Sequence, residues 1–146
     1  MKRLALAVLI AVFAVTAAFR SDAEEPIKIG IIAAYSGQFA DTAQQIDNGI
    51  RLYMKEHGDS VAGRKIEIIR RDTGGPNPDV SKRLAQELVV RDKVDILAGF
   101  PTSPEALAAA DVSAASQKFM VSMNGTASVL TTKSPDRKST RLNSSH

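Results

Sequence analysis

Residues 27–34 read IKIGIIAA, a short β-branched apolar run that Tyr35-Ser36-Gly37 closes. A run of this length that ends in a turn is typical of a strand buried on both faces. Such strands lie inside parallel sheets, whose two faces are covered by helices. The run therefore predicts a central strand of an α/β protein.

Helices and strands are expected to alternate after this run. Residues 41–57 carry apolar side chains at helical spacing and stop before Gly58. Residues 65–71 (KIEIIRR) predict a strand that is less buried and nearer an edge of the sheet, because a charged residue interrupts its apolar side chains. Asn77 can cap a further helix that reaches Asp92. The last three expected elements are a strand, an alanine-rich helix and a strand, at residues 94–98, 104–117 and 119–122.

This order of elements, with connections of a few residues, predicts right-handed crossovers and a doubly wound parallel sheet covered on both sides. The chain has 146 residues, 44% of them hydrophobic, which suffices for one domain with a real core but not for a second complete domain. It has no cysteine, so disulfides, cysteine zinc sites and thiol nucleophiles are excluded. Packing must therefore hold the protein together.

The first residues predict export. Two basic residues precede an uninterrupted apolar run at 4–15, and small residues follow it, as in a signal peptide. A membrane anchor needs about 20 apolar residues, whereas this segment meets Arg20 before reaching that length. We therefore expect a signal peptide over residues 1–23, cleaved after Ala23, with Ala18 as a second acceptable position.

The last eleven residues, 136–146 (DRKSTRLNSSH), have no apolar period and one large hydrophobe. A disordered terminus has this character. The same eleven letters are also what a widely used short-read sequencing adapter encodes in one reading frame. We therefore expect that native sequence stops at or near Pro135 and that residues 136–146 are not native.

The net charge of +3 belongs to the two ends of the chain. Residues 24–135 hold 13 Lys and Arg against 14 Asp and Glu, a net charge of −1. This body also lacks interleaved basic and aromatic side chains. We therefore expect no nucleic-acid partner.

Hydroxyl and amide side chains follow the expected strands. In doubly wound sheets ligands bind beyond the carboxyl ends of the strands. A hydroxyl beside a helix N-terminus suits a ligand carboxylate, because exposed N–H groups and the helix dipole already favour an anion there. Each Ser or Thr taken singly is equally well explained as a helix cap. The four segments are 35–39 (YSGQF), 72–75 (DTGG), 100–103 (FPTS) and 123–128 (MNGTAS).

These segments hold hardly any titratable group, which favours binding over catalysis. His57 is the one histidine before the tail, and at a helix end we expect it to face solvent or the helix dipole. Asp72 is the one carboxylate at a strand end, where capping of the following turn is its expected role. The glycines after it have neither the dinucleotide nor the phosphate-loop spacing. We expect no enzyme, no cofactor and no metal.

Taken in order, residues 27–135 resemble the leucine/isoleucine/valine-binding group of substrate-binding proteins of ABC transporters. The resemblance rests on several short motifs, of which each alone is weak. They are Ile27-Lys28-Ile29-Gly30 leading to Ser36-Gly37, Asn48-Gly49-Ile50-Arg51-Leu52, Arg71-Asp72-Thr73, Gly99 with Ser103, and Ser122 to Thr126 followed by Leu130-Thr131.

The resemblance implies a two-lobed, hinged periplasmic protein that closes on a small carboxylate-bearing solute and delivers it to an ABC permease in the inner membrane. Residues 24–135 would then be a truncated N-terminal lobe, and we expect a monomer. In that family the hydroxyls matching Ser103 and Thr126 hold the carboxylate. The remaining expected ligand-binding residues are Thr102, Asn124, Gly125, Ser36 and Phe100.

Three questions stay open at this stage. Phe100, like Phe39, is expected either to wall a ligand or to pack in the core. The solute is either an aromatic acid or a branched-chain amino acid, because proline at positions 101 and 104 and the stretch at Met123 depart from the usual amino-acid binders. The alternative functions are the extracellular sensor domain of a receptor, with the same fold, and a flavodoxin-like enzyme, which would need a cofactor.

Overall fold

The computed structural model describes residues 24–128 and residue 130. The expected signal peptide at residues 1–23 and the expected non-native tail at residues 136–146 lie outside the described residues. Within the described part of the chain, no helix is both long and apolar enough to cross a membrane.

Strands and helices alternate much as the sequence predicts. The helices are η1 (Gly37–Phe39), a short 3-10 turn, then α2 (Ala40–His57), α3 (Pro78–Val90) and α4 (Ser103–Ser116). The strands are β1 (Ile27–Ala33), β2 (Ser60–Val61), β3 (Arg64–Asp72), β4 (Ile96–Gly99) and β5 (Phe119–Ser122). The expected boundaries of the long elements differ from these by one or two residues.

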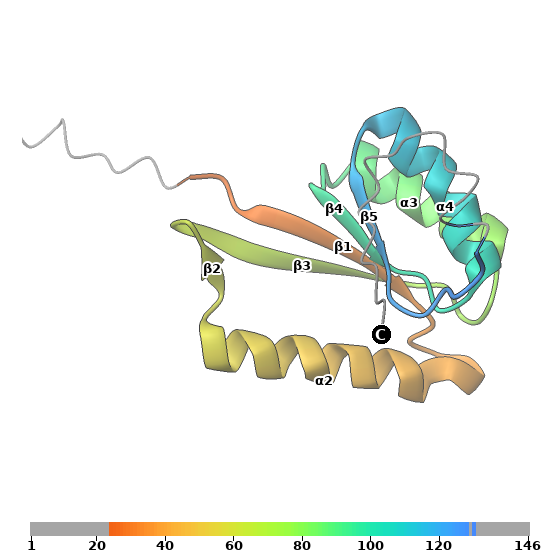
Figure 1. Ribbon diagram of the computed structural model, residues 1–146, viewed down its shortest axis with the longest axis horizontal. Helices are drawn as coiled ribbons and strands as arrows, with labels where there is room; N and C mark the ends of the chain where they lie inside the picture. Colours follow the sequence, from red (N-terminus) through yellow and green to blue (C-terminus); the bar gives the residue numbers. More distant parts are fainter. Residues whose placement is uncertain (1–23, 129, 131–146) are drawn as a thin grey trace, which may run out of the picture.

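The strands form one sheet in the order β2-β3-β1-β4-β5. β1 lies in the centre and pairs in parallel with β3 and β4, and β5 adds in parallel to β4. Figure 1 shows α2 on one face of this sheet and α3 with α4 on the other. The doubly wound α/β arrangement expected from the sequence is therefore confirmed.

The expectation of a wholly parallel sheet is wrong at one edge. β2 pairs with β3 in the antiparallel sense, with Ser60 opposite Lys65. The two residues between the strands, Ala62 and Gly63, both have positive φ (51° and 84°), as the tight two-residue hairpin turns require. A strand of two residues is too short to leave an alternating pattern in the sequence, and only its pairing with β3 defines it.

The buried core lies between the sheet and the pair α3 and α4. Gly30 of β1 allows the close approach of α3, because a Cβ at this position would lie 2.7 Å from Cδ1 of Leu88. Alanines on α4 allow a similarly close packing of the two helices. The core residues are Ile32, Leu84, Ala85, Leu88, Val94, Leu97, Phe100, Ala106, Ala109 and Val112.

The opposite face is held to α2 by a polar contact. Asp47 of α2 is buried, and its two carboxylate oxygens share the N–H of Nε of Arg70 on β3, at 2.9 and 2.7 Å. The hydroxyl of Tyr35 donates to the same carboxylate, at 3.2 Å. Apolar side chains on this side are less well covered, and Tyr53 and Phe119 are both more than half exposed.

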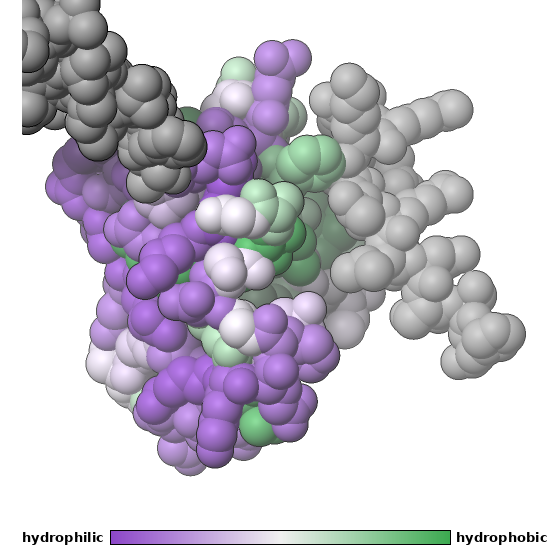
Figure 2. Space-filling model, turned by 90° about the vertical axis from the view of Figure 1, so that its left-hand side faces the viewer, coloured by the Kyte–Doolittle hydropathy of each residue, from purple (hydrophilic) through white to green (hydrophobic). Residues whose placement is uncertain are grey.

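Figure 2 views the molecule from the amino ends of the parallel strands and shows a mainly hydrophilic surface with apolar residues near its middle. The loops after the parallel strands lie at the other end of the sheet (Figure 1). That end therefore carries the segments in which the sequence predicts a ligand site.

Candidate ligand-binding site

The four segments named from the sequence emerge at one edge of the sheet. β1, β3, β4 and β5 all run in the same direction, so their carboxyl ends share that edge. The loops that follow β1 and β3 are neighbours, and so are those that follow β4 and β5. This arrangement confirms the grouping of the segments, while the role of each side chain depends on its contacts.

Ser103, the first residue of α4, connects the loops after β4 and β5. Its Oγ accepts the backbone N–H of Thr126 and that of Ala127, each at 3.1 Å. A hydroxyl has two lone pairs and one proton, so these bonds occupy the lone pairs and leave the proton for an acceptor. Beside the positive end of α4, that proton suits a carboxylate.

Thr102, the residue before α4, is held differently. Its Oγ1 donates to Oε2 of Glu105 at 2.7 Å. Glu105 is fully buried and turns toward α3, where it also accepts from Oγ of Ser81 (3.1 Å) and the N–H of Asn77 (3.4 Å). The hydroxyl proton of Thr102 is therefore hydrogen-bonded to Glu105, and while this bond persists it cannot donate to a ligand.

Asn124 and Gly125 fasten the loop after β5. Nδ2 of Asn124 donates to the carbonyl of Pro101 at 3.2 Å, and the N–H of Gly125 donates to Oγ of Ser122 at 3.0 Å. A Cβ at Gly125 would lie 2.5 Å from that Oγ, so a larger residue here would displace the Ser122 hydroxyl. The neighbouring Thr126 is exposed, and its side chain is accessible at the edge of the sheet.

Phe100 packs in the core, and its side chain exposes none of its surface. Its φ of 60° is unusual for a bulky residue, and its N–H donates to the carbonyl of Ile32 at 2.8 Å. The preceding Gly99 has φ of 108°, and a Cβ there would lie 2.2 Å from the same carbonyl oxygen. Of the two roles that the sequence left open for Phe100, the structure supports core packing, because this turn directs the ring inward.

Ser36 takes part in a contact between the loops after β1 and β3. Oδ1 of Asp72 accepts the N–H groups of Tyr35 (2.8 Å), Ser36 (3.3 Å) and Gly74 (2.8 Å). Burial acts to raise the pKa of Asp72, but these hydrogen bonds and one from the Ser36 hydroxyl outweigh it and hold the pKa below its ordinary value. The turn-capping role expected for Asp72 is confirmed.

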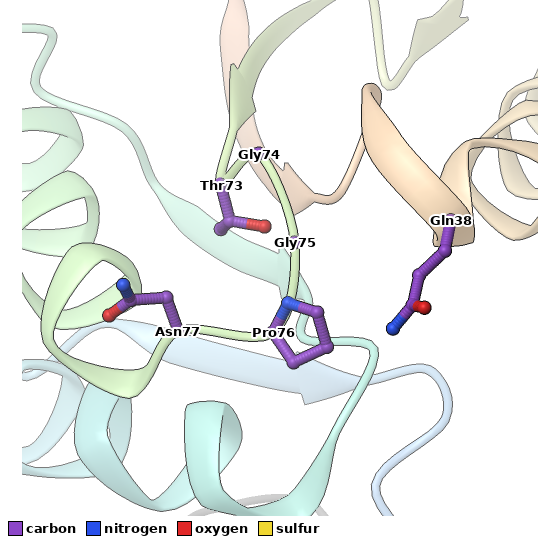
Figure 3. A pocket seen from close by; sticks show the side chains of 6 residues that line it. All are labelled: Gln38, Thr73, Gly74, Gly75, Pro76 and Asn77. Atoms are coloured by element: carbon purple, nitrogen blue, oxygen red, sulfur yellow. The ribbon is translucent and has the colours of Figure 1, made fainter.

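A hollow lies beside this contact and was not recognised from the sequence. It has a volume of about 500 Å³ and lies between η1 and the connection from β3 to α3 (Figure 3). Residues 72–75 form one of the four segments expected at the strand ends, but none of their side chains is among the expected ligand-binding residues. The usable signal was the position of Thr73 directly after a strand. The lining residues are Gln38, Thr73, Gly74, Gly75, Pro76 and Asn77.

Titratable side chains are scarce at this edge of the sheet. His57 lies at the far end of the 18-residue α2, about 27 Å along the helix, where its ring stacks on Tyr53 at 4.3 Å. In residues 24–128 and 130, no group of three or more His, Cys, Asp or Glu side chains could hold a metal ion. The arrangement is thus suited to hydrogen bonding a ligand.

A family profile described as periplasmic binding protein matches residues 26–146. The chain belongs to the periplasmic binding protein family. The matched range includes residues 136–146, and the expectation that these are foreign stays a prediction. Reading the gene from unamplified source DNA tests that prediction, and finding these residues encoded there would contradict it.

Curated relatives agree with the family. The Leu/Ile/Val-binding protein homolog 6 of Brucella abortus (strain 2308) is 40% identical over 135 residues, which are 92% of this chain and 34% of the relative. The homolog of the same name from Brucella suis biovar 1 (strain 1330) gives the same figures. The chain thus spans about a third of the length of these binding proteins, and the resemblance drawn from the sequence is confirmed.

Solved binding proteins share the fold. A solute-binding protein of an ABC transporter from Rhodopseudomonas palustris BisB5, in complex with 3,4-dihydroxybenzoic acid, is 47% identical with a TM-score of 0.72, over 75% of this chain and 30% of that one. A second R. palustris protein, in complex with 4-hydroxybenzoate, is 41% identical with the same TM-score and coverage. LivJ of Streptococcus pneumoniae, in complex with isoleucine, is 24% identical with a TM-score of 0.67, over 75% and 32% of the two chains, and shows the fold alone.

Proposed function

We propose that the complete protein is the solute-binding component of an ABC importer, and that the lobe described above holds the carboxylate of its solute. The observation that carries this proposal is the hydrogen bonding of Ser103, because its Oγ accepts two N–H groups from the loop after β5. This leaves a directed hydroxyl proton at the positive end of α4. The exposed hydroxyl of Thr126 is adjacent in this loop and is the second donor.

The buried Glu105 is compatible with an anion at this end of the helix. Its carboxylate accepts from the N–H of Asn77, which precedes α3, from Ser81 of α3 and from the hydroxyl of Thr102, so three donors offset its charge. Glu105 also keeps Thr102 in place at the start of α4. Thr102 therefore acts as a support of the site, whereas Ser103 and Thr126 face the solute.

An aromatic acid is the favoured solute. The R. palustris proteins whose structures hold dihydroxybenzoic acid and 4-hydroxybenzoate are 47% and 41% identical to this chain, whereas the isoleucine complex is 24% identical. A branched-chain amino acid is the second candidate, supported by the name of the Brucella relatives. Both share the carboxylate that Ser103 would bind.

The remaining parts of the proposal concern the whole protein. Membership of the family supports a periplasmic location, a monomer with two lobes, and an ABC permease as partner. The chain spans about a third of the curated relatives, so residues that would close over the solute from a second lobe are not among those described. No observation favours a receptor sensor over a transport component.

Isothermal titration calorimetry of the complete protein tests this function. The panel contains 4-hydroxybenzoate, benzoate, leucine and isoleucine, together with 4-hydroxybenzamide, which keeps the ring and lacks the negative charge. We expect at least one carboxylate to bind, and the amide to bind much more weakly than its acid. Equal binding of the acid and the amide, or no binding of any carboxylate, would overturn the proposal.

A further inference from the structure

The hollow beside η1 is lined by neutral polar groups. Figure 3 shows the amide of Gln38 on one side and the residues that follow β3 on the other, with Thr73 and Asn77 among them. Among the residues that the structure describes, no charged side chain lines it. Gly74 and Gly75 both have positive φ (71° and 147°), a backbone conformation that glycine adopts readily.

The hydroxyl of Thr73 has no hydrogen-bond partner within residues 24–128 and 130. Its side chain is more than nine-tenths buried, and among the described residues its Oγ1 makes no hydrogen bond. The backbone of the same residue is satisfied, because its N–H donates to the carbonyl of Ala33 at 3.0 Å. In Figure 3 the hydroxyl points to the side on which Gln38 lies, across the hollow. Buried polar groups nearly always have partners, so we expect a partner from outside the described residues here, either a water molecule or a polar group of a ligand.

The hollow and Ser103 lie at the same edge of the sheet. Thr73 directly follows β3 and Ser103 comes shortly after β4, and β1 separates these two parallel strands. Two spacings between strands amount to about 10 Å. A single six-membered ring with polar groups at opposite ends spans such a distance once a hydrogen bond is added at each end.

We propose that the hollow receives the far end of the solute, and that this end carries a hydroxyl group that pairs with Thr73 and Gln38. This inference rests on the proposed function, which anchors the carboxylate at Ser103. A charged far end would lack a counter-charge among the residues that line the hollow. A purely apolar far end would leave Oγ1 of Thr73 without a hydrogen bond to the solute, which lowers the affinity for such a solute.

The test compares benzoate with 4-hydroxybenzoate, which differ only in the far hydroxyl, by calorimetry on the complete protein. We expect the hydroxylated acid to bind about tenfold more tightly or better. Thr73→Val keeps the shape of the side chain and removes its hydroxyl, so the preference for the hydroxylated acid should fall to near parity. The matched control is Thr42→Val on α2, which should keep the preference.

A second variant is needed in case Thr73→Val fails to fold, because Thr73 is buried. Gln38 is exposed, so Gln38→Leu should be tolerated, and it should also reduce the preference for the hydroxylated acid. If both acids bind equally to the unmodified protein, or the preference survives in both variants, the inference about the hollow is wrong while the carboxylate site stands. If neither acid nor any other carboxylate binds, the proposed function fails and the inference fails with it.

Discussion

Oγ of Ser103 accepts the backbone N–H of Thr126 at 3.1 Å, which joins the start of α4 to the loop after β5. These two residues are 23 positions apart in the chain, yet the family resemblance pairs them at one carboxylate. The contact shows how one serine can both shape the loop and present a proton. It also means that removing the hydroxyl affects the site in two ways.

Ser103→Ala should weaken binding of the preferred carboxylate by about tenfold to a hundredfold, because a hydrogen bond to a charged group is lost. Calorimetry on the complete protein measures this change. Ser116→Ala is the matched control, since Ser116 lies at the other end of α4 and donates to the carbonyl of Val112. Unchanged affinity in Ser103→Ala would remove this residue from the site.

Asp47→Asn should destabilise the protein by about 1–2 kcal/mol, because it weakens the charged hydrogen bond between α2 and Nε of Arg70. The side chain of Asp47 is 11% exposed and that of Arg70 is 38% exposed, so solvent screening keeps the loss in the lower part of the usual range. Differential scanning calorimetry should show a lower Tm. Arg51→Met is the control, since its 3.9 Å contact with Asp47 is exposed and should contribute little.

Tyr35 should make stability fall at alkaline pH. Burial, followed by the charge of Asp47 and the hydrogen bond to it, raises the pKa of Tyr35 from 10.0 to about 12. The stabilisation is complete below the unfolded pKa and is lost as pH rises through the folded value, because the unfolded chain ionises first. Tyr35→Phe should flatten the pH dependence of the Tm between 10.0 and about 12. If the Tm of Tyr35→Phe depends on pH in the same way as that of the unmodified protein, the contact between Tyr35 and Asp47 does not contribute as described.

Asp72 should make stability fall at acidic pH. Its pKa is held below the ordinary value of 3.8, so its contribution is present above that value and is lost as pH falls through the folded pKa. Asp72→Asn should therefore reduce the loss of stability on acidification, measured by circular dichroism. Asp111→Asn, at an exposed side chain 3.9 Å from Lys82, should leave acid sensitivity almost unchanged.

The sequence predicted those elements whose burial repeats at a regular spacing. The apolar run of β1, the helical spacing in α2 and the capped start of α3 are local patterns, and all three appear in the structure. The pattern failed for β2, since two residues cannot show a period and only their pairing with β3 defines them. It also could not show that α2 covers its face less completely than α3 and α4 cover theirs.

The candidate site was likewise predicted in part by local sequence and in part decided by tertiary contacts. The sequence by itself determined the fold class and the family, and it placed hydroxyls at the strand ends, because these follow from residue type and order along the chain. Only the tertiary structure decided which hydroxyls are available. Thr102 donates to Glu105, Ser103 keeps a proton for an acceptor, and Thr73 is buried with no hydrogen-bond partner for its hydroxyl among the described residues. The physical reason is that the state of a hydroxyl depends on its neighbours in space, and those neighbours come from other loops and helices that the chain brings together only when it folds.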